Sequence, residues 1–158
     1  MKVLDGGRLN NADSSLVTAQ SAFNRAVQYV GEREQFGKKI QEFQALQFKL
    51  ADMSTELEAS RLILREAARK VDEDASDKTK SAAMAKRFVT DAGFNIVNEA
   101  LQIHGGYGYL KDYPLERNLR DLRVHQILEG TNEIMRVIIA REIPVSYTHL
   151  RAHETEEN

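Results

Sequence analysis

Long stripes of apolar residues at helical spacing constrain the fold of this chain more than any other feature. Apolar residues recur every three or four positions over residues 14–33, 42–71 and 79–104. This period is typical of helices that bury one face. The 158 residues include only two prolines and nine glycines, so few residues interrupt the stripes. At 1.5 Å of rise per residue, the first two helices would each be about 30–45 Å long.

Short polar residues and glycines indicate where these helices begin and end. Asp13 or Ser14 is placed to cap the first helix, and Gly37 is placed to stop it. The acidic stretch at residues 72–77 predicts a solvated turn between the second and third helices. Gly105-Gly106 should end the third helix, because glycine accepts the left-handed conformation that follows many helices.

The last third of the chain predicts shorter elements. Residues 105–113 are rich in glycine and tyrosine and are expected to form a loop. Pro114 suits the first turn of a short helix over residues 115–122. A final helix is expected over residues 131–143, and Pro144 stops it.

These elements predict an all-α fold. No segment alternates with period two over enough residues to predict a strand. We therefore predict an up-and-down bundle of four main helices with one short extra helix, in a single domain over residues 1–144. Residues 145–158 carry no apolar period, and we expect them to form a disordered or non-native tail.

Composition argues against several classes of function. A net charge of −2 and the lack of a basic block give no surface for nucleic acid or for an acidic membrane. No apolar run approaches the roughly 20 residues of a membrane-spanning helix. The chain starts without a signal-peptide pattern, so we expect a protein that is not secreted.

The sequence also predicts no metal site. The chain has no cysteine, which excludes disulfides, thiolate zinc sites and cysteine nucleophiles. No histidine is preceded by a glutamate at the three-residue spacing that di-iron helical bundles use.

The segment around Glu129 is the strongest candidate for chemistry. Gly130 and Thr131 follow this carboxylate directly, at the expected start of the last helix. A carboxylate on a glycine hinge can reach into a cavity, and the first N–H groups of a helix can hold a phosphate or an oxyanion. Partial burial beside Ile127 and Leu128 would raise its pKa and make it a usable general base. The alternative is a solvated glutamate without a role.

Three further motifs allow both a structural and a functional interpretation. Gly105-Gly106-Tyr107-Gly108 is either a helix stop or a ligand loop, although a dinucleotide-binding loop would follow a strand. Arg33 and Phe36 are either a surface arginine with a buried phenylalanine, or an arginine directed at a phosphate beside an aromatic ring. Asp5-Gly-Gly-Arg8 is expected to be a turn with a charge pair before the first helix.

Together these motifs give the chain a family resemblance. Over about residues 4–143 it resembles the C-terminal domain of the acyl-CoA dehydrogenases, and among them the short-chain and branched-chain members of the isobutyryl-CoA type. The motifs that carry the resemblance are Leu4-Asp-Gly-Gly-Arg-Leu9, Arg33-Glu-Gln-Phe-Gly37, Gln44 with Leu50-Ala-Asp-Met53, Met84-Ala-Lys86, Gln102-Ile-His-Gly-Gly-Tyr-Gly-Tyr109, Arg120-Asp121 and Ile127-Leu-Glu-Gly-Thr-Asn-Glu-Ile134.

The resemblance implies a flavoprotein oxidoreductase that uses FAD to oxidise an acyl-CoA to the 2,3-enoyl-CoA. Glu129 matches the base that removes the α-proton. Some relatives place the base at the position that is Gly7 here, which leaves Glu129 as the candidate. The implied partners are an electron-transfer flavoprotein and further copies of the chain, in a homodimer or homotetramer. The implied setting is fatty acid metabolism or branched-chain amino acid catabolism, in a bacterial cytoplasm or the mitochondrial matrix.

The resemblance also implies binding residues. Gly130, Asp5 and Arg8 match substrate-binding positions, the last two near the coenzyme A moiety. Part of the cofactor set matches positions that touch the flavin cofactor of a partner subunit. The whole set is Arg33, Phe36, Gln44, Gln102, Ile103, His104, Gly105, Gly106, Thr131, Asn132 and Glu133.

Complete members of the family have an N-terminal helical domain and a middle β domain that have no counterpart in this sequence. We therefore expect the chain to be inactive by itself. The alternative function is that of a non-catalytic helical domain for oligomerisation or interaction.

Overall fold

The computed structural model describes residues 2–144, and the tail expected at residues 145–158 lies outside this range. Most of residues 2–144 are helical, which confirms the predicted all-α fold class. The elements in chain order are α1 (Lys2–Glu32), β1 (Glu34–Gln35), β2 (Lys38–Lys39), the 3-10 helix η1 (Ile40–Glu42), α2 (Gln44–Asp72), α3 (Lys78–His104), α4 (Gly106–Tyr109), α5 (Leu115–His125) and α6 (Asn132–Arg141).

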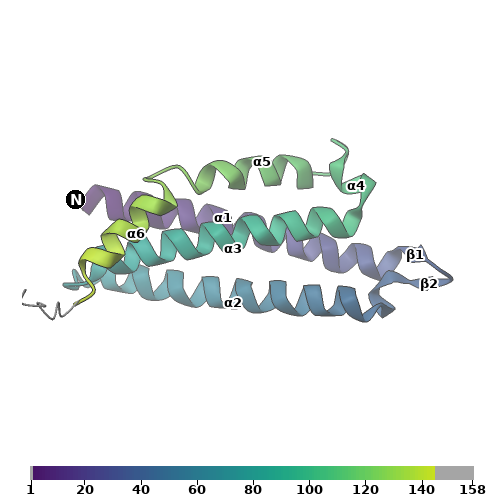
Figure 1. Cartoon of the computed structure of the whole chain (residues 1–158), viewed down its shortest axis with the longest axis horizontal. Helices are drawn as coiled ribbons and strands as arrows, with labels where there is room; N and C mark the ends of the chain where they lie inside the picture. Colours follow the sequence, from purple (N-terminus) through teal and green to yellow (C-terminus); the bar gives the residue numbers. More distant parts are fainter. Residues whose placement is uncertain (1, 145–158) are drawn as a thin grey trace, which may run out of the picture.

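Three long helices run side by side along the molecule. Figure 1 shows α1 and α3 in the middle, with α2 along one side and α5 along the other. Helix α6 crosses the end of the bundle near the start of α1 and packs on α3, and the β1–β2 hairpin projects from the opposite end. The fourth long side of the bundle is therefore formed by α5, which was expected to be the short extra helix, and α6 closes one end.

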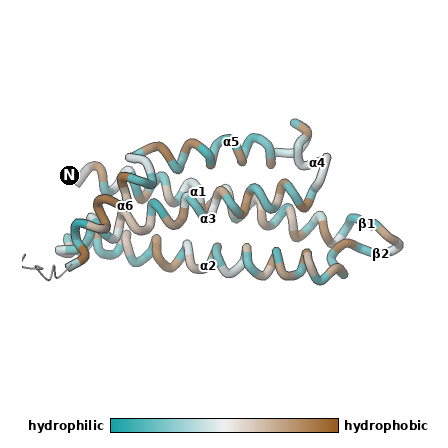
Figure 2. Tube along the Cα trace, viewed as in Figure 1, coloured by the Kyte–Doolittle hydropathy of each residue, from teal (hydrophilic) through white to brown (hydrophobic). Residues whose placement is uncertain are grey.

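Helices α1 and α3 approach each other closely because small residues line their contact. Ala19, Ala22 and Ala26 of α1 are fully buried. A Cβ added to Gly93 of α3 would lie only 3.3 Å from the backbone oxygen of Ser15 on α1. Figure 2 shows apolar and polar residues alternating along the long helices, as expected of helices with one buried face. Larger side chains complete the core, namely Met53, Leu57 and Leu64 of α2 and Leu115 and Leu122 of α5.

Helix α1 begins at Lys2, so the predictions of a turn at Asp5–Arg8 and of a cap at Asp13 or Ser14 are wrong. Two consecutive glycines inside a helix disfavour it by about 1 kcal/mol each relative to alanine. Buried contacts offset this, because the carboxylate of Asp5 accepts hydrogen bonds from Arg8 Nη1 at 3.0 Å and from Thr79 Oγ1 of α3 at 2.9 Å. A tertiary contact therefore overrides the local preference for a turn.

A two-stranded hairpin follows α1, although no strand was predicted and Gly37 was expected to stop the helix. Gln35 pairs with Lys38 across a two-residue turn. Phe36 and Gly37 in this turn have φ values of 55° and 79°, and positive φ at both central residues is the geometry of a type I′ turn. Each strand has only two residues, too few for a period-two pattern to be visible in the sequence.

Helix α3 ends at His104, as predicted, and Gly105 follows with a φ of 60°. The expected loop at residues 105–113 contains the short helix α4. A Cβ added to Gly108 would lie 2.6 Å from the backbone oxygen of Leu101. A glycine at this position therefore allows α4 to turn back against the end of α3.

The packing predicts how the truncation of single side chains on α2 changes the stability of the fold. Leu57 is buried at 3% exposure, whereas Leu62, on the same helix, is 57% exposed. Leu57→Ala should lower the free energy of unfolding by about 2–5 kcal/mol, because it leaves a cavity in the core. Leu62→Ala should change it by about 0.5 kcal/mol or less. Urea denaturation of the two variants measures the difference, and equal effects would contradict the packing described here.

Candidate functional site

Residues 126–131 form the turn between α5 and α6, and they fold into a strained hinge. Glu129 has a φ of 57° and Gly130 a φ of 91°, a left-handed conformation that non-glycine residues seldom adopt. Thr131 caps α6, because its Oγ1 accepts a hydrogen bond from the N–H of Ile134 at 3.4 Å. The predicted start of the last helix agrees with this cap.

The carboxylate of Glu129 lies over the backbone of α1. A Cβ added to Gly7 would come within 2.6 Å of Glu129 Oε2, so a side chain at position 7 and this carboxylate would occupy the same space. Gly7 and Glu129 line a groove of about 330 Å³, together with Asn10, Asn11 and other residues of α1 and the hinge. The N–H of Glu129 makes no hydrogen bond within residues 2–144.

Glu129 is exposed, so the expectation of partial burial is wrong for this chain. The flanking Ile127 and Leu128 are themselves 48% exposed and form no apolar wall around the carboxylate. The sequence placed these apolar residues beside Glu129, but they lie on the outer surface of the turn and leave the groove open.

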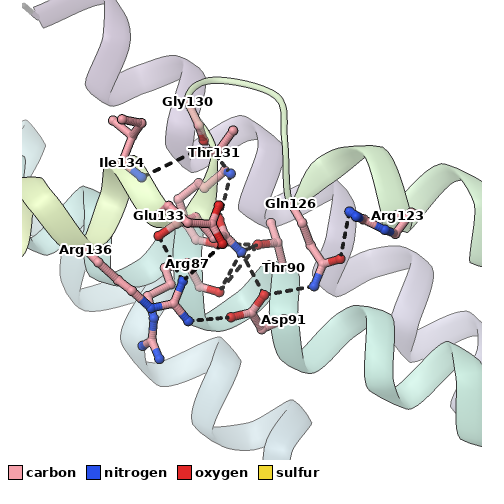
Figure 3. A network of polar contacts seen from close by, with 12 residues as sticks. Arg87, Thr90, Asp91, Arg123, Gln126, Gly130, Thr131, Glu133, Ile134 and Arg136 are labelled. Atoms are coloured by element: carbon pink, nitrogen blue, oxygen red, sulfur yellow. Dashed lines mark hydrogen bonds and ion pairs between the residues drawn. The ribbon is translucent and has the colours of Figure 1, made fainter.

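Helix α3 holds the hinge in place through a cluster of buried polar side chains. The Nζ of Lys86 donates to the carbonyl oxygen of Gly130 at 2.8 Å and to Asn132 Oδ1 at 2.8 Å. The amide nitrogen of Asn132 donates to Thr90 Oγ1 at 2.9 Å and to Asp91 Oδ1 at 2.8 Å. Figure 3 shows these contacts joining α3, the hinge and the first turn of α6.

Helix α1 holds the same hinge from the other side. Asn11 Nδ2 donates to the carbonyl oxygens of His125 at 2.9 Å and Leu128 at 3.2 Å. The hydroxyl of the buried Ser15 lies 2.8 Å from His125 Nδ1. Burial lowers the pKa of His125, against the opposing effect of the Asp121 carboxylate. The imidazole is therefore mainly neutral at pH 7.

No sequence motif indicates a role for the residues that fix the hinge, namely Asn11, Ser15, Lys86 and Thr90. One signal for Lys86 was available. Lys86 lies three or four residues from Ala82, Ala83 and Val89, on a helix face that is mostly apolar. A lysine in such a position requires a buried hydrogen-bond partner.

Asp5 and Arg8, which were predicted to lie near coenzyme A, are buried at 1% and 8% exposure. They form an ion pair with each other at 3.0 Å. The Nε of Arg8 is buried without a hydrogen-bond partner within the described residues. In this chain the pair mainly ties the start of α1 to α3, and only a small part of Arg8 reaches the surface.

A pocket of about 530 Å³ at the hairpin end of the bundle is lined by six of the predicted cofactor residues, namely Arg33, Phe36, Ile103, His104, Gly105 and Gly106, but not by Gln44 or Gln102. The guanidinium of Arg33 lies 5.6 Å from the ring centroid of Tyr107. Phe36, at the tip of the hairpin, is 90% exposed, which contradicts its interpretation as a buried corner residue. Gln44, at the start of α2, and Gln102 are exposed.

His104 forms the floor of this pocket. It is buried and stacks on Tyr29, with ring centroids 4.2 Å apart. Its Nδ1 lies 2.7 Å from the carbonyl oxygen of Ala100, so Nδ1 carries the proton and donates. Burial lowers the pKa of His104. Ile103 is also buried, whereas Gly105 and Gly106 are exposed with no atom within 4 Å of an added Cβ.

The predicted site residues therefore form two groups at opposite ends of one chain. Glu129 lies beside Gly7, near the start of α1. Arg33 directly follows Glu32, the last residue of the same helix. At 1.5 Å per residue these positions are about 40 Å apart. Thr131, Asn132 and Glu133 belong to the Glu129 end, as the position of α6 in Figure 1 shows. Of these three, Asn132 is buried and its amide faces α3.

Among residues 2–144, no three histidine or acidic side chains are grouped so that they could hold a metal ion. In that same range no helix is sufficiently long and apolar to cross a membrane.

Comparison with known proteins gives consistent matches. The family model described as "Acyl-CoA dehydrogenase, C-terminal domain" matches residues 1–143. The chain is 51% identical to the mitochondrial isobutyryl-CoA dehydrogenase of Bos taurus over 143 residues, which cover 90% of the chain and 34% of that relative. It is 46% identical to the caffeyl-CoA reductase-Etf complex subunit CarC of Acetobacterium woodii, over 89% of the chain and 37% of that relative.

The fold matches a solved structure as closely. The three-dimensional structure of butyryl-CoA dehydrogenase from Megasphaera elsdenii superimposes with a TM-score of 0.84 at 43% identity, over 87% of this chain and 36% of that one. The chain thus spans about a third of the length of the relatives that it matches.

Two neighbouring glycines test the placement of Glu129. An added Cβ at Gly7 would collide with the Glu129 carboxyl group, whereas one at Gly6 would meet nothing within 4 Å. Gly6→Ala should stabilise the fold by about 0.5–1 kcal/mol through helix propensity. Gly7→Ala should also not destabilise the fold, but it should displace the carboxyl group and change the ¹³C shift of Glu129 Cδ. An unchanged shift in Gly7→Ala would contradict the contact.

Proposed function

The chain belongs to the acyl-CoA dehydrogenase family and carries its C-terminal domain, and we propose that it supplies the catalytic base of a flavin-dependent acyl-CoA oxidoreductase. The base is Glu129. The proposal rests mainly on the hinge, which holds a carboxylate beside an open groove, together with a backbone N–H that has no hydrogen-bond partner in the described part of the chain. The domain extends over residues 1–144.

Glu129 and its own N–H account for two needs of the reaction. A proton α to a thioester is weakly acidic, so its removal requires both a base and stabilisation of the charge that develops on the thioester oxygen. The carboxylate of Glu129 takes the α-proton, and the electrons of that C–H bond enter the new Cα–Cβ double bond. The N–H of Glu129 donates to the thioester oxygen, and Gly130 lies against the substrate.

Exposure of Glu129 in this chain is consistent with the role. Among residues 2–144, α1 and the hinge bound the groove beside it, and its open side is available to an acyl chain and to further protein. Exclusion of water by these occupants would remove solvent from around the carboxylate and strengthen its interaction with the substrate.

FAD is the proposed cofactor, and the pocket at the hairpin end has the chemistry to hold part of it. Arg33 offers a guanidinium suited to a diphosphate. Tyr107 and Phe36 offer aromatic rings, and the open backbone at Gly105 and Gly106 allows close approach. When bound, FAD would supply the acceptor for the β-hydrogen of the substrate, which leaves as hydride. Gln44, Gln102, Ile103 and His104 complete this part of the site. Thr131 and Glu133 serve the cofactor at the other end, where Asn132 is turned inward and holds the hinge.

The distance between the two ends implies that two copies of the chain form one site. Arg33 and Glu129 of a single chain are about 40 Å apart, too far to serve the same reaction. We infer a homodimer, or a homotetramer of two such dimers, in which Arg33 of one copy faces the cofactor served by Glu129 of another.

The relatives suggest the substrate class and the electron partner. Isobutyryl-CoA and butyryl-CoA dehydrogenases favour a short or branched acyl-CoA, and with it a role in branched-chain amino acid catabolism or fatty acid metabolism. The caffeyl-CoA reductase–Etf relative supports an electron-transfer flavoprotein as partner. In the reductive direction Glu129 would return the proton to the α-carbon. Mitochondrial and bacterial relatives favour the mitochondrial matrix or the bacterial cytoplasm.

The alternative is a helical domain that oligomerises without catalysis. Exposed apolar side chains at α6 favour it, with Ile134 at 50% and Val137 at 43% exposure. It predicts assemblies of this chain that remain colourless after incubation with FAD. A flavin absorbance spectrum retained after gel filtration would argue against it.

Glu129→Gln tests the base in the full-length enzyme that carries this domain. Glutamine preserves the shape but cannot accept the α-proton, so kcat should fall by about 100-fold to 10,000-fold. The flavin absorbance should be retained, because the hinge is unchanged. Glu142→Gln, an exposed position at the end of α6, is the control and should keep wild-type turnover. Near wild-type turnover in Glu129→Gln would refute the assignment of the base.

Mixing two inactive variants of the full-length enzyme tests whether two copies share one site. Arg33→Ala should lose flavin and activity, and Glu129→Gln should lose the base. A dimer with one chain of each kind retains one site with both residues intact. Random dimers from an equal mixture, unfolded and refolded together, should recover about a quarter of wild-type activity. Recovery no greater than that of the two variants alone would mean that each site draws both residues from one chain.

A further inference from the structure

Lys86 is the largest side chain that the described part of the chain buries completely, with 0% exposure. It lies on α3, directly beneath the hinge that carries Glu129. The proposed reaction gives it no task, because it is enclosed by protein and cannot touch the groove. A buried ammonium group is nevertheless costly to desolvate, so its position requires an explanation.

The hydrogen bonds of Lys86 converge on the residues that follow Glu129. Its Nζ donates to the carbonyl oxygen of Gly130 and to Asn132 Oδ1, each at 2.8 Å. The orientation of the Asn132 amide is fixed, since its nitrogen donates to Thr90 and Asp91. Lys86 is therefore held against a rigid partner and directs a second of its three donors at the backbone of the hinge.

The hinge needs such an anchor. Gly130 has a φ of 91°, and glycine has more backbone conformations available than any other residue. A free Gly130 carbonyl would let the Gly130–Thr131 peptide, which joins the hinge to α6, rotate about the Gly130 backbone. Such a rotation would shift Glu129 relative to α6 and redirect both the carboxylate and the N–H that the reaction uses.

Charges around Lys86 favour its protonated form without fully compensating its burial. Burial lowers the pKa of Lys86 to about 8, although Asp91 on α3, Glu133 on α6 and Glu129 on the hinge raise it, and Arg8 on α1 lowers it further. At pH 7 the amine is therefore mainly an ammonium group. An apolar residue of similar size would avoid the desolvation and would often be as stable or more stable. Stability alone does not explain a lysine here.

We propose that Lys86 is a positioning residue that sets the direction of the Glu129 carboxylate and N–H through its hydrogen bond to the Gly130 carbonyl. This inference rests on the proposed role of Glu129 as the base. Lys86 itself touches neither substrate nor cofactor.

Lys86→Met tests the proposal in the full-length enzyme, because methionine keeps an unbranched side chain of similar length and removes the donor. We expect kcat to fall by about tenfold to 100-fold, as displaced catalytic groups typically cause, and KM to change by about threefold or less, since the groove is untouched. Leu57→Ala, whose side chain is buried on α2 and outside the hinge cluster, is the control for lost stability. Assayed below its unfolding transition, it should keep kcat within about twofold of wild type.

A kcat within about twofold of wild type in Lys86→Met would overturn the proposal. So would an equal loss in Leu57→Ala, because the effect would then follow stability and not the hinge. The Glu129→Gln variant separates this failure from that of the proposed function. If Glu129→Gln is inactive while Lys86→Met has normal turnover, the assignment of Glu129 as the base is supported and the positioning role of Lys86 is refuted. If Glu129→Gln is active, the base itself is wrong.

An NMR titration of the unmodified chain gives a readout that needs neither activity nor a variant. The N–H of Thr131 belongs to the same peptide unit as the Gly130 carbonyl. Its shift should therefore follow the loss of the proton from Lys86, with a midpoint near the pKa of about 8. A Thr131 amide that does not respond while the Lys86 side chain titrates would also overturn the proposal, even if Lys86→Met fails to fold.

Discussion

The close contact between α1 and α3 is the constraint on which the rest of the structure depends. Buried alanines on α1 and Gly93 on α3 let the two backbones approach to near van der Waals distance. At one end this brings Gly7 under the Glu129 carboxylate and Lys86 under the Gly130 carbonyl. Larger residues along the contact would separate the helices, and the hinge would then lose one of the two helices that hold it.

The same long helices also separate the two groups of functional residues. A rigid rod of α1's length keeps the hinge and the hairpin about 40 Å apart, so no small rearrangement of one chain unites them. The proposed shared site follows from this length. The bundle carries a different chemical group at each end, a carboxylate at one and an arginine beside aromatic rings at the other. Assembly, not folding, would complete the site.

Much of the fold could be predicted, because helical periodicity is a local property. The end of α3 was predicted from Gly105, which has a positive φ, and the start of α6 from Thr131, which caps it. The start of α1 could not be predicted, since Gly6 and Gly7 disfavour a helix until the buried carboxylate of Asp5 bonds to Thr79 of α3. The hairpin was missed because its strands are too short to show a period.

For the candidate site, the sequence by itself determined the chemical groups, namely a carboxylate before a glycine at the start of a helix, and an arginine beside aromatic residues. Only the tertiary structure decided their environment. It left Glu129 open to solvent, turned Asn132 inward, and placed the ammonium of Lys86 beneath the hinge. The reason is physical. Local sequence sets backbone preferences over a few residues, whereas burial and hydrogen bonding at this hinge depend on residues more than 40 positions away, on helices brought together by packing.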